Sequence, residues 1–212
     1  MSELATLNKS LSFLAAFAVV GALLAMAFLL VENQGKLQEG ALKVRKRATA
    51  FAGAWLVASV LHIFLTLANI LGTSFADALE RNTLRSFLTQ VDLGQYLGVQ
   101  TAMIAVIALA IRFVRTVLAA TILLLFSLIT LTIPVFQSHS ASSGSHQLAI
   151  GSLVVHVVAL SLWVGGIFAI VALPDSDRKF ALPRFSQMAL WTAIAVVISG
   201  IANAWARLNF MD

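Results

Sequence analysis

The stretch LAIGSLVVHVVALSLWVGGIFAIVAL, from Leu148 to Leu173, contains no Asp, Glu, Lys or Arg, and its one ionisable side chain is His156. It exceeds the ~20 apolar residues that a membrane-spanning helix requires. The rest of the chain shares this character, because 60% of the 212 residues are hydrophobic and only 11% are charged. The mean hydropathy is +0.94. The sequence therefore predicts an integral membrane protein.

Six apolar stretches reach the length of a span, so we expect an all-α, polytopic membrane helix bundle of about six transmembrane helices. We expect one membrane domain over residues 1–212. The first stretch is longer than the core of a signal peptide and no A-x-A cleavage site follows it, so we interpret it as a retained helix. The predicted spans are 11–31, 48–72, 94–111, 116–136, 148–173 and 187–206.

The basic residues orient these spans. Ten of the fourteen Lys and Arg fall in the loops after spans one, three and five, and four fall on the other side. Because cytoplasmic loops are enriched in Lys and Arg, both termini are predicted to lie outside. The ten are Lys36, Lys43, Arg45, Lys46, Arg47, Arg112, Arg115, Arg178, Lys179 and Arg184.

The outer segment TSFADALERNTLRSFLTQV, residues 73–91, has apolar residues near helical spacing and polar residues between them. This pattern predicts one outer amphipathic helix between spans two and three. Two arrangements remain open: a helix lying on the membrane surface, or a lid packed over the end of the bundle.

Several functional classes do not fit. The net charge of +5 comes from loops between spans, so we expect no nucleic-acid partner. The chain has no cysteine, which removes disulfides, thiolate metal sites and CxxC redox pairs. No Ser-His-Asp set, H-E-x-x-H or phosphate loop is present, so we do not expect an enzyme. Intramembrane carboxylates, which proton-coupled carriers commonly use, are missing from the spans.

Two histidines are the only ionisable side chains at membrane depth, and such residues indicate function by default. At ~1.5 Å per residue, His156 lies roughly 12 Å and His62 roughly 15 Å below the outer side. Met103 is at a comparable level, and His139 and His146 lie at the outer mouth. Imidazole suits copper, zinc and iron, and thioether suits Cu(I). These five residues form a candidate metal site.

Trp163 follows His156 by seven residues, almost on the same helix face, and Gly165 and Gly166 permit close helix approach. We expect these three residues to form the floor of a pocket. Structural roles remain open for all of these positions. A buried histidine can satisfy a backbone carbonyl or a serine, and His139 and His146 can be solvated loop residues. Met103 can be core or lipid-facing, and the glycine pair can serve helix packing alone.

The stretch SHSASSGSHQLAIGSLVVHVVALSLWVGGIFAIVAL resembles the CopD family of copper resistance proteins, which has a histidine-bearing outer loop, a buried histidine and W-x-G-G. The later stretch RFSQMALWTAIAVVISGIANAWARL is also similar, through Arg184, Phe185, Ser186 and Gly200. The resemblance is densest over residues 135–208, and before that only the topology agrees. The family continues with further helices beyond the span that ends near Arg207, so three interpretations stay open for this chain: a truncated member, a fragment or a short homologue.

The resemblance implies a copper-handling protein of the bacterial inner (plasma) membrane, working with a periplasmic copper carrier of CopC type. Copper ion would be bound outside by His139 and His146 and received at depth by His156. A fused domain in similar proteins implies a cytochrome oxidase assembly protein as a possible partner, in which case the histidines would serve copper delivery. A third hypothesis is a haem b protein with His62 and His156 as axial ligands, since bis-imidazole ligation needs two histidines at matched depth.

Overall fold

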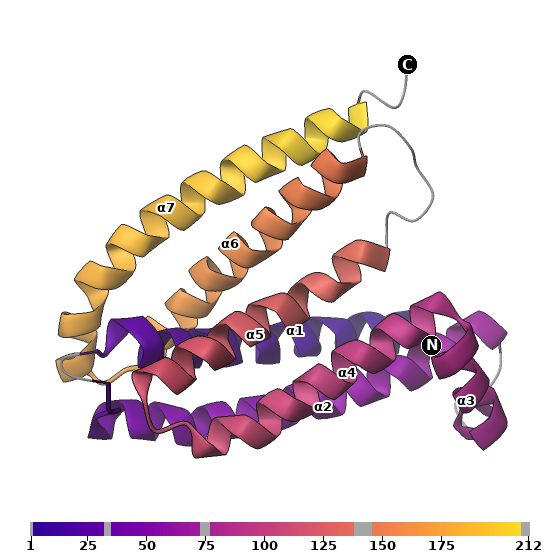
Figure 1. Ribbon diagram of the computed structural model, residues 1–212, viewed down its shortest axis with the longest axis horizontal. Helices are drawn as coiled ribbons and strands as arrows, with labels where there is room; N and C mark the ends of the chain where they lie inside the picture. The colour runs from indigo at the N-terminus through magenta and orange to yellow at the C-terminus, as the bar shows by residue number, and fades with distance from the viewer. Residues whose placement is uncertain (1, 32–34, 73–76, 138–145, 209–212) are drawn as a thin grey trace.

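The computed structural model describes residues 2–31, 35–72, 77–137 and 146–208, which form helices joined by short turns (Figure 1). In this part of the chain six helices are long and apolar enough to cross a membrane, which confirms the predicted all-α bundle. They are α1 (Ser2–Leu24, continued by the π-helical turn η1, Ala25–Leu29), α2 (Glu39–Leu71), α4 (Asp92–Ala110, followed by the 3₁₀ turn η3, Ile111–Phe113), α5 (Val117–Gln137), α6 (His146–Ala172) and α7 (Asp175–Leu208).

Three helices begin well before their predicted spans. We expected spans to start near residues 11, 48 and 187, but α1 starts at Ser2, α2 at Glu39 and α7 at Asp175. The apolar window marks the part inside the membrane, whereas helical hydrogen bonding continues into the basic segments. Side-chain pairs one turn apart contribute there, with Glu39–Lys43 at 3.2 Å and Asp175–Arg178 at 3.1 Å. The inner loop predicted after span five is therefore largely the first turns of α7.

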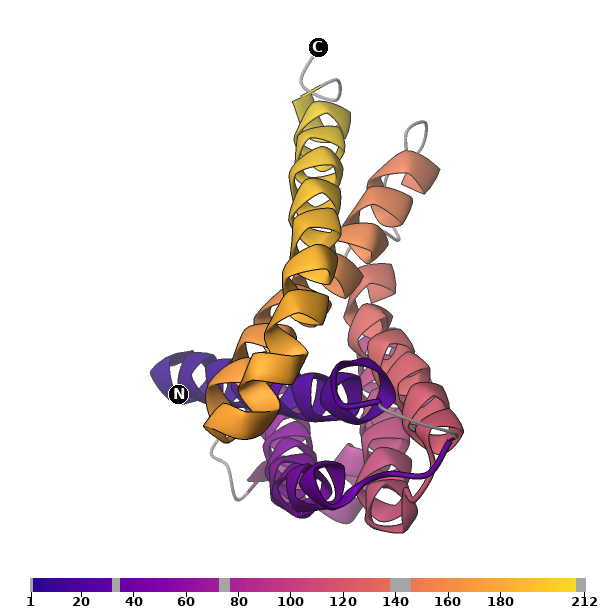
Figure 2. The same ribbon diagram turned by 90° about the vertical axis from the view of Figure 1, so that its left-hand side faces the viewer.

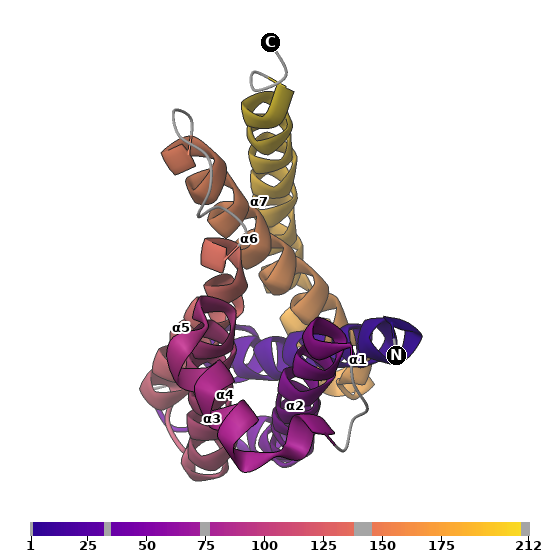
Figure 3. The ribbon, with the colours of Figure 1, turned by 90° about the vertical axis from the view of Figure 1, so that its right-hand side faces the viewer.

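The helices form two groups. α1, α2, α4 and α5 pack side by side, and α6 and α7 form an antiparallel hairpin that diverges from them towards its free end (Figures 1, 2 and 3). The hairpin joins the first group mainly where α6 packs against α1, with a smaller contact between α6 and α5. The outer half of the hairpin is thus formed by α6 and α7 alone.

α1 is the central helix of the bundle. Val19, Val20, Leu23 and Met26 on α1 and η1 are almost completely buried. α6 crosses it at two glycines: a Cβ built on Gly21 would lie 2.0 Å from the backbone oxygen of Gly165. Helices in membranes associate through small residues that let backbones approach, and this crossing is an example.

Arginines cap helix ends at the basic face, which the loop charges predict to be the inner one. Arg184 donates to the carbonyl oxygens of Phe28, Leu29 and Val31 where η1 ends. Arg178 donates to carbonyl oxygens at the end of α6. Arg45 donates to Val114 O at 2.9 Å, just after η3. The last carbonyls of a helix lack partners within it and favour cations, so residues that set topology also cap helices here.

The predicted outer amphipathic helix is present as α3 (Arg81–Gln90), preceded by the 3₁₀ turn η2 (Asp77–Leu79). Its Phe87 is buried in an apolar cluster with Ile63, Leu67 and Leu97, which lie on α2 and α4. α4 approaches so closely that a Cβ on Gly94 would meet Phe87 O at 2.0 Å. These contacts favour the lid arrangement, in which α3 covers the outer ends of α2 and α4.

Candidate functional site

His156 lies on α6, on the side that faces α7. Its ring Nδ1 is 3.2 Å from the carbonyl oxygen of Val196 and 3.2 Å from Ser199 Oγ. A carbonyl oxygen can only accept, so the Val196 contact requires the hydrogen to be on Nδ1. Ser199 donates its own hydrogen to Ala195 O at 2.5 Å, which leaves its oxygen free to accept from the ring. Both partners therefore select the same tautomer.

This tautomer leaves the lone pair on Nε2, the form in which a neutral imidazole binds a metal. Metal-ligating histidines generally donate their other ring N–H to a carbonyl or carboxylate, which fixes the ring and raises its basicity. The position around His156 has this arrangement. The structural alternative is a histidine that only donates a hydrogen bond to a carbonyl. It uses the same Nδ1 bond but gives no role to Nε2.

A cavity lies between α6 and α7, next to Ser199, which contacts the His156 ring; His156 itself is not among its lining residues. Its volume is about 430 Å³, and Ser199 is one of its lining residues. The other lining residues are Gly151, Ser152, Val155, Ala195, Ile198 and Ala202. One turn further along α7, Asn203 has a buried Oδ1 with no hydrogen-bond partner within the described structure. The outer half of the hairpin thus contains polar groups within an otherwise apolar helix pair.

His62 lies on α2 and is half-buried. Its Nδ1 is buried without a hydrogen-bond partner in the described part of the chain. One turn before it, Ala58 O accepts from Asn8 Nδ2 at 3.0 Å, which places this segment of α2 against the start of α1. His156 instead belongs to the α6–α7 pair, and α2 does not pack along either of those helices. The structure does not bring these two rings together.

Met103 is partly buried on α4. The hydroxyls of Ser59 on α2 and Thr101 on α4 lie 2.7 Å apart and mark a common depth for the two helices. Because α2 and α4 run in opposite directions, Met103 is about 7.5 Å deeper along the helix axes than His62 at ~1.5 Å per residue. The predicted similarity of depth is therefore approximate, to within two helical turns.

The two outer histidines fall where the structure gives no side chain. His139 lies outside the described residues, and His146 begins α6 but its side chain is not described. Among the described side chains, no group of three or more His, Asp or Glu residues could hold a metal ion. The predicted set of His139, His146, His156, His62 and Met103 stays a prediction.

The three residues predicted to form a pocket floor occupy helix contacts. Gly165 packs on Gly21, and a Cβ on Gly166 would lie 2.3 Å from the ring of Phe185 on α7. Trp163 is partly buried and packs against the main apolar core. Close packing accounts for both glycines, which was the structural alternative for them.

A second, larger cavity lies between α1, α2 and α6. Its volume is about 970 Å³, and residues of α1, α2 and α6 line it. Asn8 and Arg47 are the polar lining residues, and the remainder are apolar or glycine. A metal ion in transit needs donor groups in place of its water, so this cavity does not provide an ion path.

The six long apolar helices define a multi-pass helical membrane protein, and comparison with known proteins shows its family. The family model described as copper resistance protein D-like, N-terminal domain, matches residues 1–148. The chain belongs to this family of copper resistance membrane proteins. The match covers the part in which the sequence motifs were weaker, and so adds to the resemblance seen over residues 135–208. No curated protein and no solved structure matches the chain.

The sequence analysis did not predict the role of Ser199, which lies on α7, forty-three residues after His156 in the chain, and contacts its ring. Ser199 directly precedes Gly200, and a Cβ on Gly200 would lie 3.7 Å from the same ring. Gly200 had been noted for its resemblance to the family. The serine that directly precedes this glycine was the feature of the sequence that could have pointed to a contact with His156.

Proposed function

We propose that this protein binds copper at its outer face and passes it into or across the membrane, with His156 as the ligand at depth. Membership of the copper resistance protein D-like family supports copper as the ion. The observation that carries the proposal is the bond from His156 Nδ1 to α7, which leaves Nε2 available for a metal. In this proposal copper is cargo and not a resident cofactor.

The outer histidines complete the proposed route. His139 and His146 capture the ion on the outer side, at the open end of the α6–α7 hairpin, and His156 receives it about two to three turns further along α6. Imidazole ligands in succession suit this role, because each can release the ion to the next. His62 and Met103 lie in the other helix group and would take part at a later step.

The proposed setting is the plasma membrane of a bacterium, with the outer face in the periplasm. A soluble copper carrier of CopC type would deliver the ion to His139 and His146. Delivery to a cytochrome oxidase assembly protein is the alternative fate of the ion, and it uses the same ligands without movement across the membrane.

The experiment is a copper titration of the detergent-purified chain beside His156→Ala and a matched Ser161→Ala control. Ser161 is also a buried polar residue of α6, but its hydroxyl bonds to Val157 within its own helix. We expect wild-type and control to bind copper and His156→Ala to bind at least about tenfold more weakly. Equal copper binding by all three proteins would contradict the proposed role of His156. A Soret band that disappears with His156→Ala would favour haem.

Transport and delivery are separated by reconstitution. Proteoliposomes that contain the wild-type chain should accumulate copper in the lumen if the ion crosses the membrane. Binding without accumulation would favour delivery to a partner on the outer side.

A further inference from the structure

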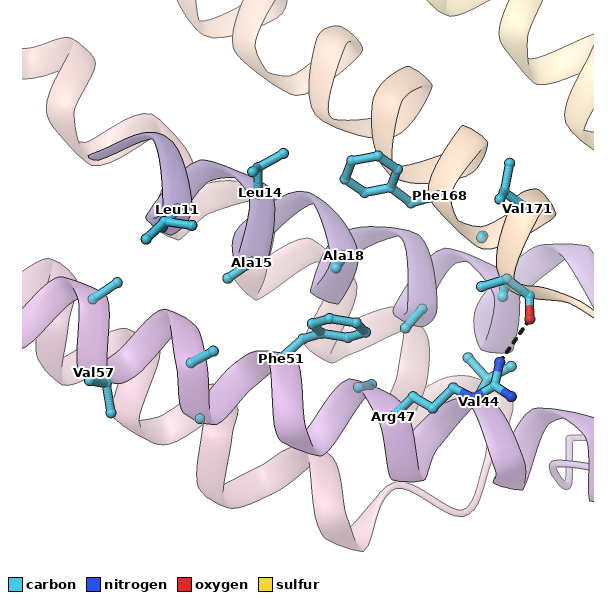
Figure 4. Close-up of a pocket in the computed structure, with 18 of the residues that line it drawn as sticks. Leu11, Leu14, Ala15, Ala18, Val44, Arg47, Phe51, Val57, Phe168 and Val171 are labelled. Atoms are coloured by element: carbon cyan, nitrogen blue, oxygen red, sulfur yellow. Dashed lines mark hydrogen bonds between the residues drawn. The ribbon is translucent and has the colours of Figure 1, made fainter. Parts of the chain in front are cut away.

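The groove between α1, α2 and α6 has a floor of small side chains. Ala15, Ala18, Ala22 and Ala25 follow one face of α1 and its continuation η1, and Gly53, Ala54 and Ala58 contribute from α2. Two rings, Phe51 from α2 and Phe168 from α6, lie over it (Figure 4). The small side chains leave an apolar groove of about 970 Å³ whose described lining comes from α1, η1, α2 and α6.

The inner end of this groove has a positive charge. Arg47 is exposed and donates from Nη1 to Ala172 O at 2.8 Å, which holds its guanidinium at the end of α6 (Figure 4). A guanidinium has five N–H donors, so this bond leaves most of them available. Arg47 is the one charged side chain among the described residues that line the groove, so this mouth carries a positive charge. The mouth is at the inner, basic face, which is the depth of lipid headgroups.

The charge distinguishes between two occupants of such a groove. A transmembrane helix that lay in it would bring its own inner flank to the mouth, and inner flanks are rich in Lys and Arg. That arrangement puts like charges together. A phospholipid instead brings an anionic phosphate to Arg47 and an acyl chain to the apolar groove. Arginine binds phosphate through short, charge-assisted hydrogen bonds, often two in parallel.

We propose that this groove is a binding site for a glycerophospholipid of the inner leaflet. Its acyl chain lies against the alanine face of α1, and its phosphate accepts hydrogen bonds from Arg47. The lipid then fills the space between α1, α2 and α6 and bridges the two helix groups. This inference does not depend on copper binding.

The test is quantification of the phospholipid that stays with the detergent-purified protein, by native mass spectrometry and by extraction. Two variants address the two ends of the lipid: Ala18→Phe fills the groove, and Arg47→Gln removes the charge. Two matched controls make the same changes elsewhere. Ala102→Phe is on an exposed position of α4, and Arg112→Gln is an exposed inner-face arginine that does not line the groove.

We expect wild-type and both controls to retain a phospholipid. The amount retained by Arg47→Gln should be lower by a factor of about ten or more, because the variant loses a hydrogen bond between charged groups. Ala18→Phe should lose the lipid and remain monodisperse. If no lipid survives purification, adding phospholipid vesicle extract should raise the melting temperature of wild-type but not of Arg47→Gln. Equal retention by all five proteins, or no response to added lipid, would overturn the proposal. A dimer that Ala18→Phe dissociates would assign the groove to a second copy instead.

Discussion

Replacing Gly21 by alanine tests the contact that joins the two helix groups. The added Cβ would lie 2.0 Å from Gly165 O and 2.7 Å from Gly165 C, whereas ordinary contacts begin at 3.4 Å. The two backbones must therefore separate by about 1.4 Å, the difference between the first and last of these distances, to reach ordinary contact. Because the obstacle is backbone, no side-chain rotation relieves it.

The expected cost follows from these distances. Overpacking a tight contact costs about 1–3 kcal/mol. We take the upper end because the added Cβ meets backbone atoms, which cannot rotate away as a side chain can. Alanine recovers up to about 1 kcal/mol relative to glycine inside a helix. We therefore expect Gly21→Ala to lower the free energy of unfolding by about 2 kcal/mol, or the melting temperature by about 4–8 °C.

Thermal unfolding in detergent, followed by tryptophan fluorescence, measures this shift without a cysteine dye, since the chain has four Trp and no Cys. The matched control is Gly151→Ala on α6, where a Cβ meets nothing within 4 Å. The control should be as stable as wild-type or slightly more stable. If Gly21→Ala melts at the same temperature as Gly151→Ala, the described crossing of α1 and α6 is wrong.

Three further changes test other contacts. Arg184→Gln removes the donor to three carbonyls where η1 ends, and should cost about 1–3 kcal/mol of unfolding free energy, measured by the same melting assay; an unchanged melt would argue against the cap. Phe87→Ala should release α3, with a cost of about 3–5 kcal/mol if the cluster does not collapse, and faster proteolysis of residues 77–91 than in the wild-type would report it. Ser199→Ala should weaken copper binding by about tenfold and shift the ¹⁵N signals of the His156 ring, whereas Ser199→Thr should restore both; copper affinity unaffected by Ser199→Ala would show that the bond does not position the ring.

The spans were predictable because each depends only on local composition. An apolar run of about 20 residues is long enough to cross the membrane whatever its neighbours are, and the basic loops then predict the orientation. The helix starts of α2 and α7 were not predictable in this way, because hydropathy ends where the charges begin and the helices do not. The amphipathic segment before α4 was recognisable from its spacing, but only the packing of Phe87 distinguished a lid from a surface helix.

The candidate site was predictable as residue types and not as contacts. His156 stands out as an ionisable residue in an apolar run, yet its partners Val196 and Ser199 depend on the rotation of α7, which a hydropathy pattern does not contain. The same limitation applies to His62, whose matched depth did not bring it to His156. Arg47 was read as a topology marker, and its position at the mouth of a groove emerges only when α1 and α6 are in place.

The most direct test of the central claim is X-ray absorption at the copper edge of the copper-loaded chain, compared with His156→Gln. The account predicts imidazole scattering in the wild-type spectrum that decreases in the variant, because Nε2 of His156 is a ligand. Identical spectra from the two proteins, at equal copper content, would contradict it.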